Sequence, residues 1–354
     1  MLEFSKYQGL GNDFLLIDAR GCGDTDALLG LTPDWVVHLC DRRFGVGGDG
    51  VILALPPNQG GELRMRIFNA DGTEPEMCGN GIRCLARFLA DRDGDLAGRT
   101  WQVDTLAGRI VPALLPDGMI RVDMGAPFLQ PEQVPTSLAV GPQGLPQGQL
   151  VVDGETFAVA AAGMGNPHVV VPVDELEDLD LERFGAALEV HPAFPARTNV
   201  HFVQVHSPTH LQMRVWERGA GPTLACGTGA CATLVACHLL GLCERRARLD
   251  LPGGPLQIDW EQSSGKVFME GPAEHVFDGR LAAPRKVPAA PALDCATVCA
   301  NGCIRPDDCA SSEARARVEA LLNSSSLDDL VALATNSLES RTRARFDRDS
   351  GLSG

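Results

Sequence analysis

Two cysteines, Cys78 and Cys226, each open a Cys-Gly-x-Gly segment that precedes a predicted long helix. A helix N-terminus has unpaired backbone N–H groups and partial positive charge, so a thiol there is predicted to ionise more easily than usual. The adjacent glycines let the backbone approach a ligand and turn its N–H groups inward, which favours binding of a carboxylate. If the two helix starts face each other, one carbon atom can lie between two sulfurs.

Such a pair of thiols has the chemistry to invert a carbon centre beside a carboxylate. One thiolate removes the Cα proton, and the opposite thiol donates a proton to the other face. Because Cα–H is a very weak acid, preorganised N–H donors must stabilise the charge that develops on the carboxylate. A redox disulfide is disfavoured because neither cysteine belongs to a C-x-x-C motif. None of the three lysines lies in a convincing active-site loop, which disfavours a pyridoxal enzyme.

The other reading of a cysteine is a small buried hydrophobe. It suits the cysteines that lie outside the two motifs, namely Cys22, Cys40, Cys84, Cys231, Cys237 and Cys243.

The elements that position the two motifs come in two similar halves. Apolar residues at i, i+3, i+4 and i+7 predict a helix over 79–91, and an almost wholly apolar run predicts a buried helix over 227–240. Shorter helices are predicted over 34–43 and 176–187. Strands are predicted over 14–18, 51–55, 63–69, 101–106, 109–115, 119–124, 150–162, 168–171, 199–206, 210–217, 247–251, 256–261 and 266–271.

At 354 residues the chain is long enough for two domains. We predict an N-terminal α+β domain over 1–126 and a similar C-terminal domain over 127–269, entered through a segment rich in Pro, Gly and Gln. Each domain contributes one cysteine to a shared cleft. A Pro/Ala-rich linker then leads into a separate extension over 282–354.

Composition excludes several classes of partner. The net charge of −16 and the pI of about 4.9 disfavour nucleic acid and anionic membranes, which need a positive face. There is no apolar stretch long enough to span a membrane, and the first residues do not resemble a signal peptide. We therefore expect a cytoplasmic protein with reduced thiols. The sequence is compatible with both a monomer and a homodimer.

The extension carries four closely spaced cysteines in a C-x3-C-x3-C-x5-C pattern. Four thiolates this close could bind zinc or an iron–sulfur cluster, although the spacing matches no standard motif for either. The alternative is a Cys-rich extension without metal. The cysteines concerned are Cys295, Cys299, Cys303 and Cys309.

A series of motifs resembles the diaminopimelate epimerase family, in family order over nearly all of residues 1–281. The motifs are Gly9-Leu10-Gly11-Asn12-Asp13-Phe14, Phe68-Asn69-Ala70-Asp71-Gly72, Met77-Cys78-Gly79-Asn80-Gly81-Ile82-Arg83-Cys84, Gly165-Asn166-Pro167-His168, Arg197-Thr198-Asn199, Glu217-Arg218-Gly219-Ala220-Gly221, Ala225-Cys226-Gly227-Thr228-Gly229 and Leu251-Pro252-Gly253-Gly254.

The resemblance implies a pair of similar α+β domains, each with a barrel-like mixed or antiparallel sheet around a central helix. The last strand, near 270–281, would return to the first domain. The implied activity is conversion of LL-2,6-diaminopimelate to the meso form, a step toward lysine and cell wall, with no cofactor and no metal.

The resemblance also implies a set of site residues. Cys78 and Cys226 would be catalytic, with His168 supporting them; the alternative for His168 is a packed histidine after a turn proline. A bidentate guanidinium suits the distal carboxylate of a substrate with two amino-acid ends. The implied substrate-binding residues are Arg218, Asn69 and Asn199 at the distal end, Asn12, Asn166 and Glu217 at the reacting end, and Gly79, Asn80, Gly227 and Thr228 at the helix starts.

One departure and two rivals accompany the resemblance. Some family members carry a substrate-contacting Gln where this chain has Gly50, so that contact is missing or replaced. A proline or hydroxyproline racemase shares the two-cysteine plan, but a small ring needs no distal clamp such as Glu217-Arg218. A non-catalytic amino-acid-binding module would be expected to lose one cysteine, and both are present.

Overall fold

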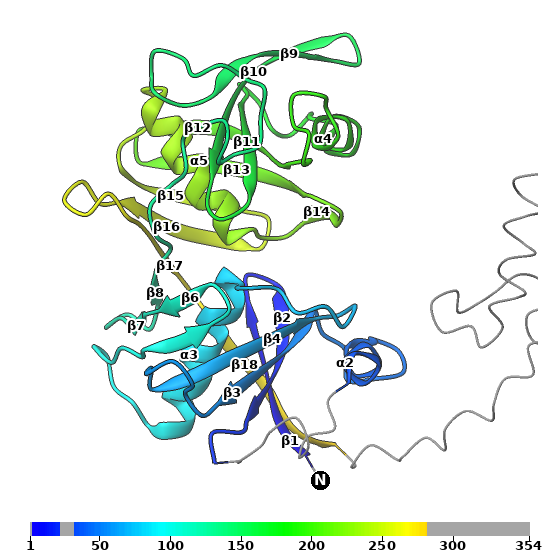
Figure 1. Cartoon of the computed structure of the whole chain (residues 1–354), viewed down its shortest axis with the longest axis vertical. Helices are drawn as coiled ribbons and strands as arrows, with labels where there is room; N and C mark the ends of the chain where they lie inside the picture. Colours follow the sequence, from blue (N-terminus) through cyan, green and yellow to red (C-terminus); the bar gives the residue numbers. More distant parts are fainter. Residues whose placement is uncertain (1, 22–31, 282–354) are drawn as a thin grey trace, which may run out of the picture. The chain divides into compact units, whose positions relative to one another are not determined.

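The computed structural model describes residues 2–21 and 32–281 (Figure 1). The predicted extension, with its four cysteines and the expectations about metal, lies outside the described residues.

A seven-stranded sheet carries most of the first half of the chain, in the order β18-β1-β2-β3-β4-β5-β6. Phe14 and Leu16 of β2 join the core around helix α3 (Gly79–Asp93), whereas Leu15 and Ile17 join a cluster on the opposite face with helix α2 (Pro33–Cys40). This alternation is expected of a strand that is covered on both faces. The strands are β1 (Leu2–Gly9), β2 (Asn12–Asp18), β3 (Gly50–Leu55), β4 (Leu63–Asn69), β5 (Val103–Thr105), β6 (Gly108–Ile110) and β18 (Glu274–Leu281).

An eleven-stranded sheet carries most of the second half, in the order β7-β8-β17-β16-β15-β13-β12-β11-β10-β9, with β14 paired to β13. Most neighbours are antiparallel, and β11–β12 and β13–β15 are parallel. The strands are β7 (Pro112–Leu114), β8 (Ile120–Asp123), β9 (Gln147–Val152), β10 (Glu155–Gly163), β11 (Pro167–Pro172), β12 (Asn199–Ser207), β13 (His210–Glu217), β14 (Gly221–Thr223), β15 (Arg246–Leu251), β16 (Gly254–Trp260) and β17 (Val267–Gly271).

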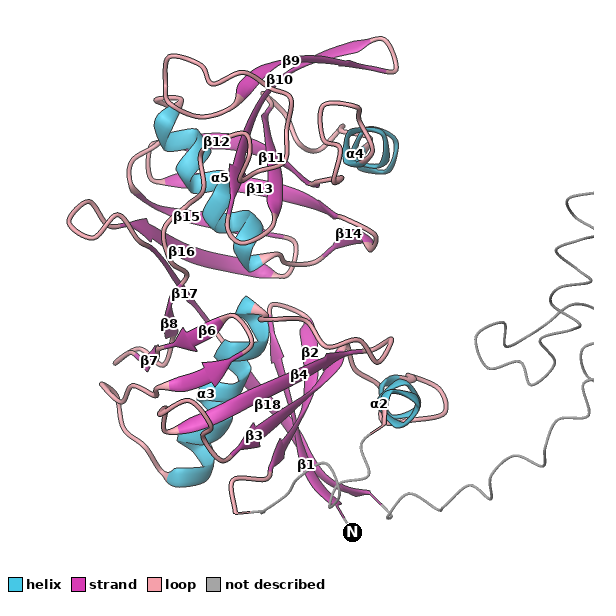
Figure 2. Ribbon diagram, viewed as in Figure 1, coloured by secondary structure: helices cyan, strands magenta, loops and turns pink. Residues whose placement is uncertain are grey.

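Two long helices lie against these sheets (Figure 2). Helix α3 packs on β1, β2, β7 and β8, and helix α5 (Gly227–Leu239) packs on β10, β11, β12 and β16. The core residues of both helices form one cluster, which confirms the predicted buried helix and the mixed-sheet α+β fold class. The helices are α2 (Pro33–Cys40), α3 (Gly79–Asp93), α4 (Leu181–Glu189) and α5 (Gly227–Leu239).

The chain crosses between the sheets twice. Between β6 and β7 it leaves the seven-stranded sheet, and β8 then pairs with β17 of the larger sheet. After β17 the chain passes through Pro272 and Ala273 into β18, which pairs antiparallel with β1. This is where the resemblance placed the returning strand.

Three sequence predictions were wrong in detail. The strand predicted over 109–115 is two strands in different sheets, because Pro112 lacks the N–H that continuous pairing would need. The strand predicted over 150–162 is a hairpin whose turn is Asp153-Gly154, both with positive φ, which is a strong hairpin signal. The helix predicted over 176–187 begins at Leu181, where the Asp180 side chain accepts the Arg183 N–H.

Candidate active site

Cys78 is the N-cap residue of α3. Its backbone is extended (φ −138°, ψ 119°), and its Sγ accepts a hydrogen bond from the Gly81 N–H at 3.4 Å. The side chain is half-buried and reaches a cleft in the molecule. Its sulfur therefore lies beside the unpaired N–H groups of a helix start, where an anion is stabilised.

Cys226 is the N-cap residue of α5, with a similar extended backbone (φ −126°, ψ 107°). Cys226 is only 5% exposed, and its side chain makes no capping hydrogen bond. Its sulfur lies 3.5 Å from the hydroxyl oxygen of Thr228. The same local motif thus holds the two sulfurs in different surroundings.

The starts of the two helices meet. A β-carbon built on Gly79 would lie 3.9 Å from the Cα of Gly227, and the Asn80 amide donates to the Ala225 carbonyl at 3.3 Å. A β-carbon on Gly227 would lie only 2.9 Å from the Met269 sulfur, so the Met269 side chain would have to move. Glycine at both positions therefore favours this close approach.

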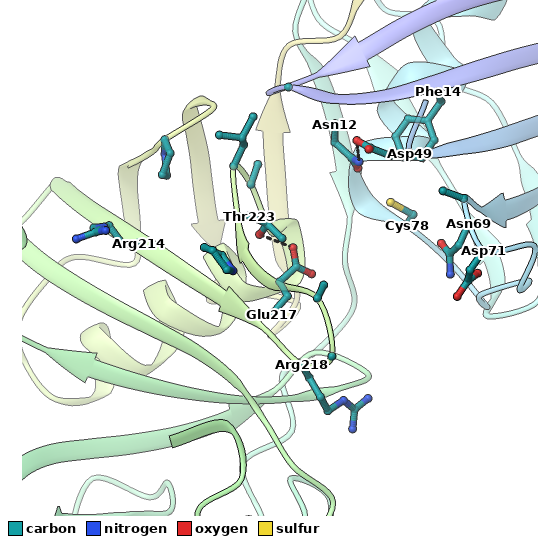
Figure 3. Close-up of a pocket in the computed structure, with 18 of the residues that line it drawn as sticks. Asn12, Phe14, Asp49, Asn69, Asp71, Cys78, Arg214, Glu217, Arg218 and Thr223 are labelled. Carbon is teal, nitrogen blue, oxygen red and sulfur yellow. Dashed lines mark hydrogen bonds between the residues drawn. The ribbon is translucent and has the colours of Figure 1, made fainter. Parts of the chain in front are cut away.

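A cleft of about 970 Å³ opens beside the helix starts (Figure 3). Five of the predicted site residues line it, namely Asn12, Asn69, Cys78, Glu217 and Arg218. Residues of both sheets therefore contribute to one cleft. Its other charged lining residues are Arg42, Asp49, Asp71 and Arg214.

Glu217 lies at the end of β13, and its carboxylate lines the cleft. Its Oε1 accepts a hydrogen bond from the Thr223 hydroxyl at 2.6 Å. Burial raises the pKa of this carboxyl group, and hydrogen bonds from Thr223 and Cys226 partly oppose the rise. A cationic group bound beside Glu217 would therefore stabilise it as a carboxylate.

The expectation that both cysteine pKa values are depressed was wrong for this structure. Burial raises the pKa of Cys78, and the Gly81 and Asn80 N–H groups and Arg83 only partly oppose it. The pKa of Cys226 is raised well above the usual value, first by burial and then by the charge of Glu217. Desolvation thus outweighs the helix termini, and Cys226 is the more strongly protonated thiol.

The Asn12 side chain is held by an acidic neighbour. Its amide donates to Asp49 at 2.6 Å, and its carbonyl oxygen accepts from the Asn80 amide at 3.3 Å. Arg42 in turn contacts Asp49 at 2.8 Å. A hydrogen-bonded chain therefore connects the cleft wall to the start of α3.

Asn69 and Asn199 occupy different positions. Asn69 lines the cleft and donates to the Thr73 hydroxyl at 2.9 Å. Asn199 is buried: its amide donates to the Pro167 carbonyl at 2.9 Å, and its oxygen accepts the Arg218 backbone N–H at 3.0 Å. In this structure Asn199 fixes the backbone of Arg218, whose guanidinium donates to the Ala196 carbonyl and extends from the cleft wall (Figure 3).

His168 lies near Cys226 and is connected by hydrogen bonds to Asn166 and to the buried His201. Its Nε2 lies 2.7 Å from the Asn166 oxygen, and its Nδ1 lies 2.8 Å from Nε2 of His201. Because an amide oxygen only accepts, His168 donates from Nε2 and accepts at Nδ1 from His201. Both imidazoles are fully buried, which lowers both pKa values, that of His201 to about 3. The pair is neutral and fixes the orientation of Asn166.

Comparison with known proteins identifies the relatives of this chain. The diaminopimelate epimerase family model matches residues 4–129 and 160–276. The chain is 61% identical over 281 residues to a diaminopimelate epimerase of Prochlorococcus marinus, covering 79% of this chain and 93% of that protein. It is 55% identical over 280 residues to that of Acaryochloris marina, covering 78% and 98%. The chain belongs to the diaminopimelate epimerase family, a family of isomerases. The motif resemblance is confirmed.

Solved structures share the fold of this epimerase at low identity. A hydroxyproline epimerase from Agrobacterium vitis aligns with a TM-score of 0.57 and 15% identity, covering 80% of this chain and 93% of the other. A phenazine biosynthesis protein of the PhzF family from Bacillus anthracis aligns with a TM-score of 0.56 and 16% identity, covering 79% and 99%. At such identity these likenesses show the fold alone.

Sequence reasoning missed three residues of this epimerase site. Asp49 anchors Asn12, His201 supports His168, and Arg83 lies one turn inside α3. Arg83 lies in one of the motifs that resemble the family, and Asp49 directly precedes Gly50, but the roles of both depend on contacts distant in sequence. Alternation along β12 could have placed His201 on the same face as Asn199.

A metal-type donor set also occurs at this site. Among the described residues, His168, His201 and Cys226 have possible ligand atoms within 4.8 Å of one another, and all three are buried. His168 is already hydrogen-bonded to His201 and to Asn166. The Nδ1 atom of His201 is buried and has no hydrogen-bond partner among the described residues. The buried cysteines Cys40, Cys84, Cys231, Cys237 and Cys243 confirm the packing role predicted for them.

Proposed function

We propose that the chain converts LL-2,6-diaminopimelate to the meso isomer by a two-cysteine, two-base mechanism that needs no cofactor. The observation that carries this proposal is the meeting of two Cys-capped helix starts, joined by the Asn80–Ala225 hydrogen bond. The carboxylate of the reacting end would bind the N–H groups at Gly79, Asn80, Gly227 and Thr228. Its Cα would then lie between the two sulfurs.

In both directions of the reaction, one cysteine gains a proton and the other loses one. The thiolate of one cysteine takes the Cα proton and becomes a thiol. The thiol of the other delivers its proton to the opposite face and becomes a thiolate. The helix-start N–H groups stabilise the charge on the substrate carboxylate while the Cα is planar.

The raised thiol pKa values call for a source of positive charge. The charge of Glu217 raises the pKa of both sulfurs. The substrate ammonium bound beside Glu217 would cancel that charge, so binding of the substrate itself would help one thiol to ionise. Asn12 and Asn166 complete the polar wall around the reacting end.

Charges along the cleft suit a long zwitterion. Three carboxylates and three guanidiniums line it, which matches a substrate with two carboxylates and two ammonium groups. We propose that Arg218, with Asn69 and Asn199, holds the distal amino-acid end. A proline-like ring has no second pair of charges to use this surface.

We also propose that the enzyme works in the cytoplasm, on the way to lysine and cell-wall precursors. The seven cysteines in the described ranges are free, as a reducing compartment would keep them. No helix in those ranges is long and apolar enough to cross a membrane.

The test is epimerase activity of matched cysteine variants. Cys78→Ala and Cys226→Ala should each lose activity by about 10⁴-fold or more in both directions, because each removes one of two proton-transfer groups. Cys84→Ala and Cys231→Ala alter buried cysteines of the same two helices and should stay within severalfold of the wild type. Robust turnover by either catalytic-cysteine variant would refute the mechanism, and an inactive wild type would refute the substrate.

A further inference from the structure

Arg83 is a buried cation near the site that the proposed mechanism has not used. It lies one turn into α3 and is 0% exposed. β-Carbons built on Gly9 and Gly271 would lie 3.3 Å from its Nη2 and 3.2 Å from its Nε. The guanidinium is therefore enclosed by the backbone of β1 and of β17.

Every hydrogen-bond acceptor around this guanidinium is neutral. Its Nη1 donates to the Gly79 carbonyl at 3.2 Å, its Nε to the Pro272 carbonyl at 3.2 Å, and its Nη2 to the Asn80 oxygen at 3.0 Å. Within residues 2–21 and 32–281, no carboxylate forms an ion pair with Arg83. An enclosed charge without a counter-ion is costly, so its presence needs a reason beyond packing.

Three thiols are the groups whose ionisation would compensate this charge, namely those of Cys78, Cys84 and Cys231. Cys84 and Cys231 are fully buried and have pKa values of about 12. Cys78 alone of the three reaches the cleft and accepts a helix-start N–H. Cys78 is therefore the thiol of the three whose thiolate can form at the cleft, and Arg83 is one of the groups that favour that thiolate.

Arg83 also orients an amide between the two helices. Because the Asn80 oxygen accepts from Arg83, its nitrogen must point toward Asn12 and the Ala225 carbonyl, each at 3.3 Å. Ala225 directly precedes Cys226. One guanidinium thus influences the charge state of one cysteine and the approach of the other.

We propose that Arg83 is a positioning residue that favours the Cys78 thiolate and, through Asn80, holds the two helix starts together. The proposal rests on the two-cysteine function for its catalytic consequence. Its effect on Cys78 does not require any particular substrate.

The experiment measures the rate of iodoacetamide labelling of Cys78 against pH, by peptide mass spectrometry of the full chain, in wild type, Arg83→Met and Arg83→Lys. Labelling reports the thiolate fraction. Loss of the charge in Arg83→Met should slow labelling at pH 8 about tenfold or more, which corresponds to a pKa rise of about one unit. Arg87→Met is the matched control: Arg87 lies on the same helix, is half-exposed and pairs with Asp91, and its loss should leave labelling unchanged.

The Arg83→Lys variant keeps the positive charge but loses the planar guanidinium, so it tests the two roles separately. It should keep the labelling profile close to the wild type, yet lower kcat because a point charge cannot hold Asn80 as the fork does. A folded Arg83→Met with a wild-type labelling profile would overturn the charge role. If Arg83→Met does not fold, a wild-type kcat/KM profile for Arg83→Lys would overturn the positioning role. Labelling needs no turnover, so a failure of the proposed substrate would remain distinguishable.

Discussion

The starts of α3 and α5 have nearly the same sequence but different surroundings. Cys78 is half-buried, accepts a hydrogen bond from Gly81 and lines the cleft. Cys226 is 5% exposed, lacks a capping bond and lies over a neutral histidine pair. At equivalent positions five residues further on, α3 has Arg83 and α5 has Cys231.

The local motif sets where a sulfur lies, while neighbours distant in sequence set how it titrates. Arg83 opposes the effect of burial on the pKa of Cys78, whereas hydrogen bonds from Thr228 and the Gly229 backbone oppose it at Cys226. We therefore expect Cys78 to ionise first and Cys226 to hold its proton.

Among substitutions outside the two cysteines, Glu217→Gln should have the largest effect. Loss of the ammonium partner should lower kcat/KM by about 10²- to 10³-fold, since a charged hydrogen bond in a buried site contributes several kcal/mol. Because the charge of Glu217 raises both thiol pKa values, the same variant should label faster with iodoacetamide at both cysteines. Steady-state kinetics and peptide mapping give the two readouts. Slower labelling would contradict the electrostatic role of Glu217.

Arg218→Lys should chiefly raise KM for diaminopimelate, by about 10- to 100-fold, because an ammonium cannot bind a carboxylate bidentately. Arg183→Lys provides a control, since Arg183 is an exposed residue of α4 that pairs with Asp153. Loss of kcat at unchanged KM would place Arg218 in the chemical step rather than at the distal end.

Direct labelling should separate the two cysteines. At pH 8 and without substrate, Cys78 should react with iodoacetamide about tenfold or more faster than Cys226, since the labelling rate follows the thiolate fraction and access. Mass-spectrometric time courses of the two peptides provide the measurement. Equal rates, or faster labelling of Cys226, would remove the asymmetry.

The smallest effect concerns acid stability near Cys226. The folded-state pKa of His201 is about 3, below its value of 6.5 in the unfolded chain, so unfolding takes up a proton between these values. The free energy of unfolding should therefore fall as the pH drops below 6.5, by up to about 1.4 kcal/mol per pH unit for one proton. Urea unfolding of His201→Gln should show a pH slope shallower by that amount. Parallel slopes would mean that His201 titrates normally.

Much of the fold was predictable because it follows from local patterns. The 3.6-residue periodicity of α3, the apolar α5 and the Cys-Gly-x-Gly starts are properties of contiguous sequence. The crossing of β7 into the other sheet was not predictable in this way, because it depends on which strands meet in space. The Asp153-Gly154 hairpin carried a local signal that was overlooked.

The same distinction between local patterns and contacts distant in sequence applies to the site. Cys78, Glu217 and Arg218, which the motifs had singled out, line one cleft. The direction of the cysteine pKa shifts was missed because desolvation depends on tertiary burial, which no motif encodes. At Gly50 a β-carbon would lie 2.4 Å from the Phe68 carbonyl oxygen, so this backbone leaves no room for the Gln of some family members. The neighbouring Asp49 lines the cleft instead.

Isotope transfer from solvent tests whether two thiols act on opposite faces of one carbon. LL-diaminopimelate should be followed in D₂O through the first few per cent of conversion, by mass spectrometry of separated stereoisomers. The account predicts that nearly all new meso product carries one solvent deuterium, because the donating thiol has already exchanged, while unreacted LL substrate stays unlabelled. Early product that retains the original proton would contradict it, since only a single base could carry that proton across.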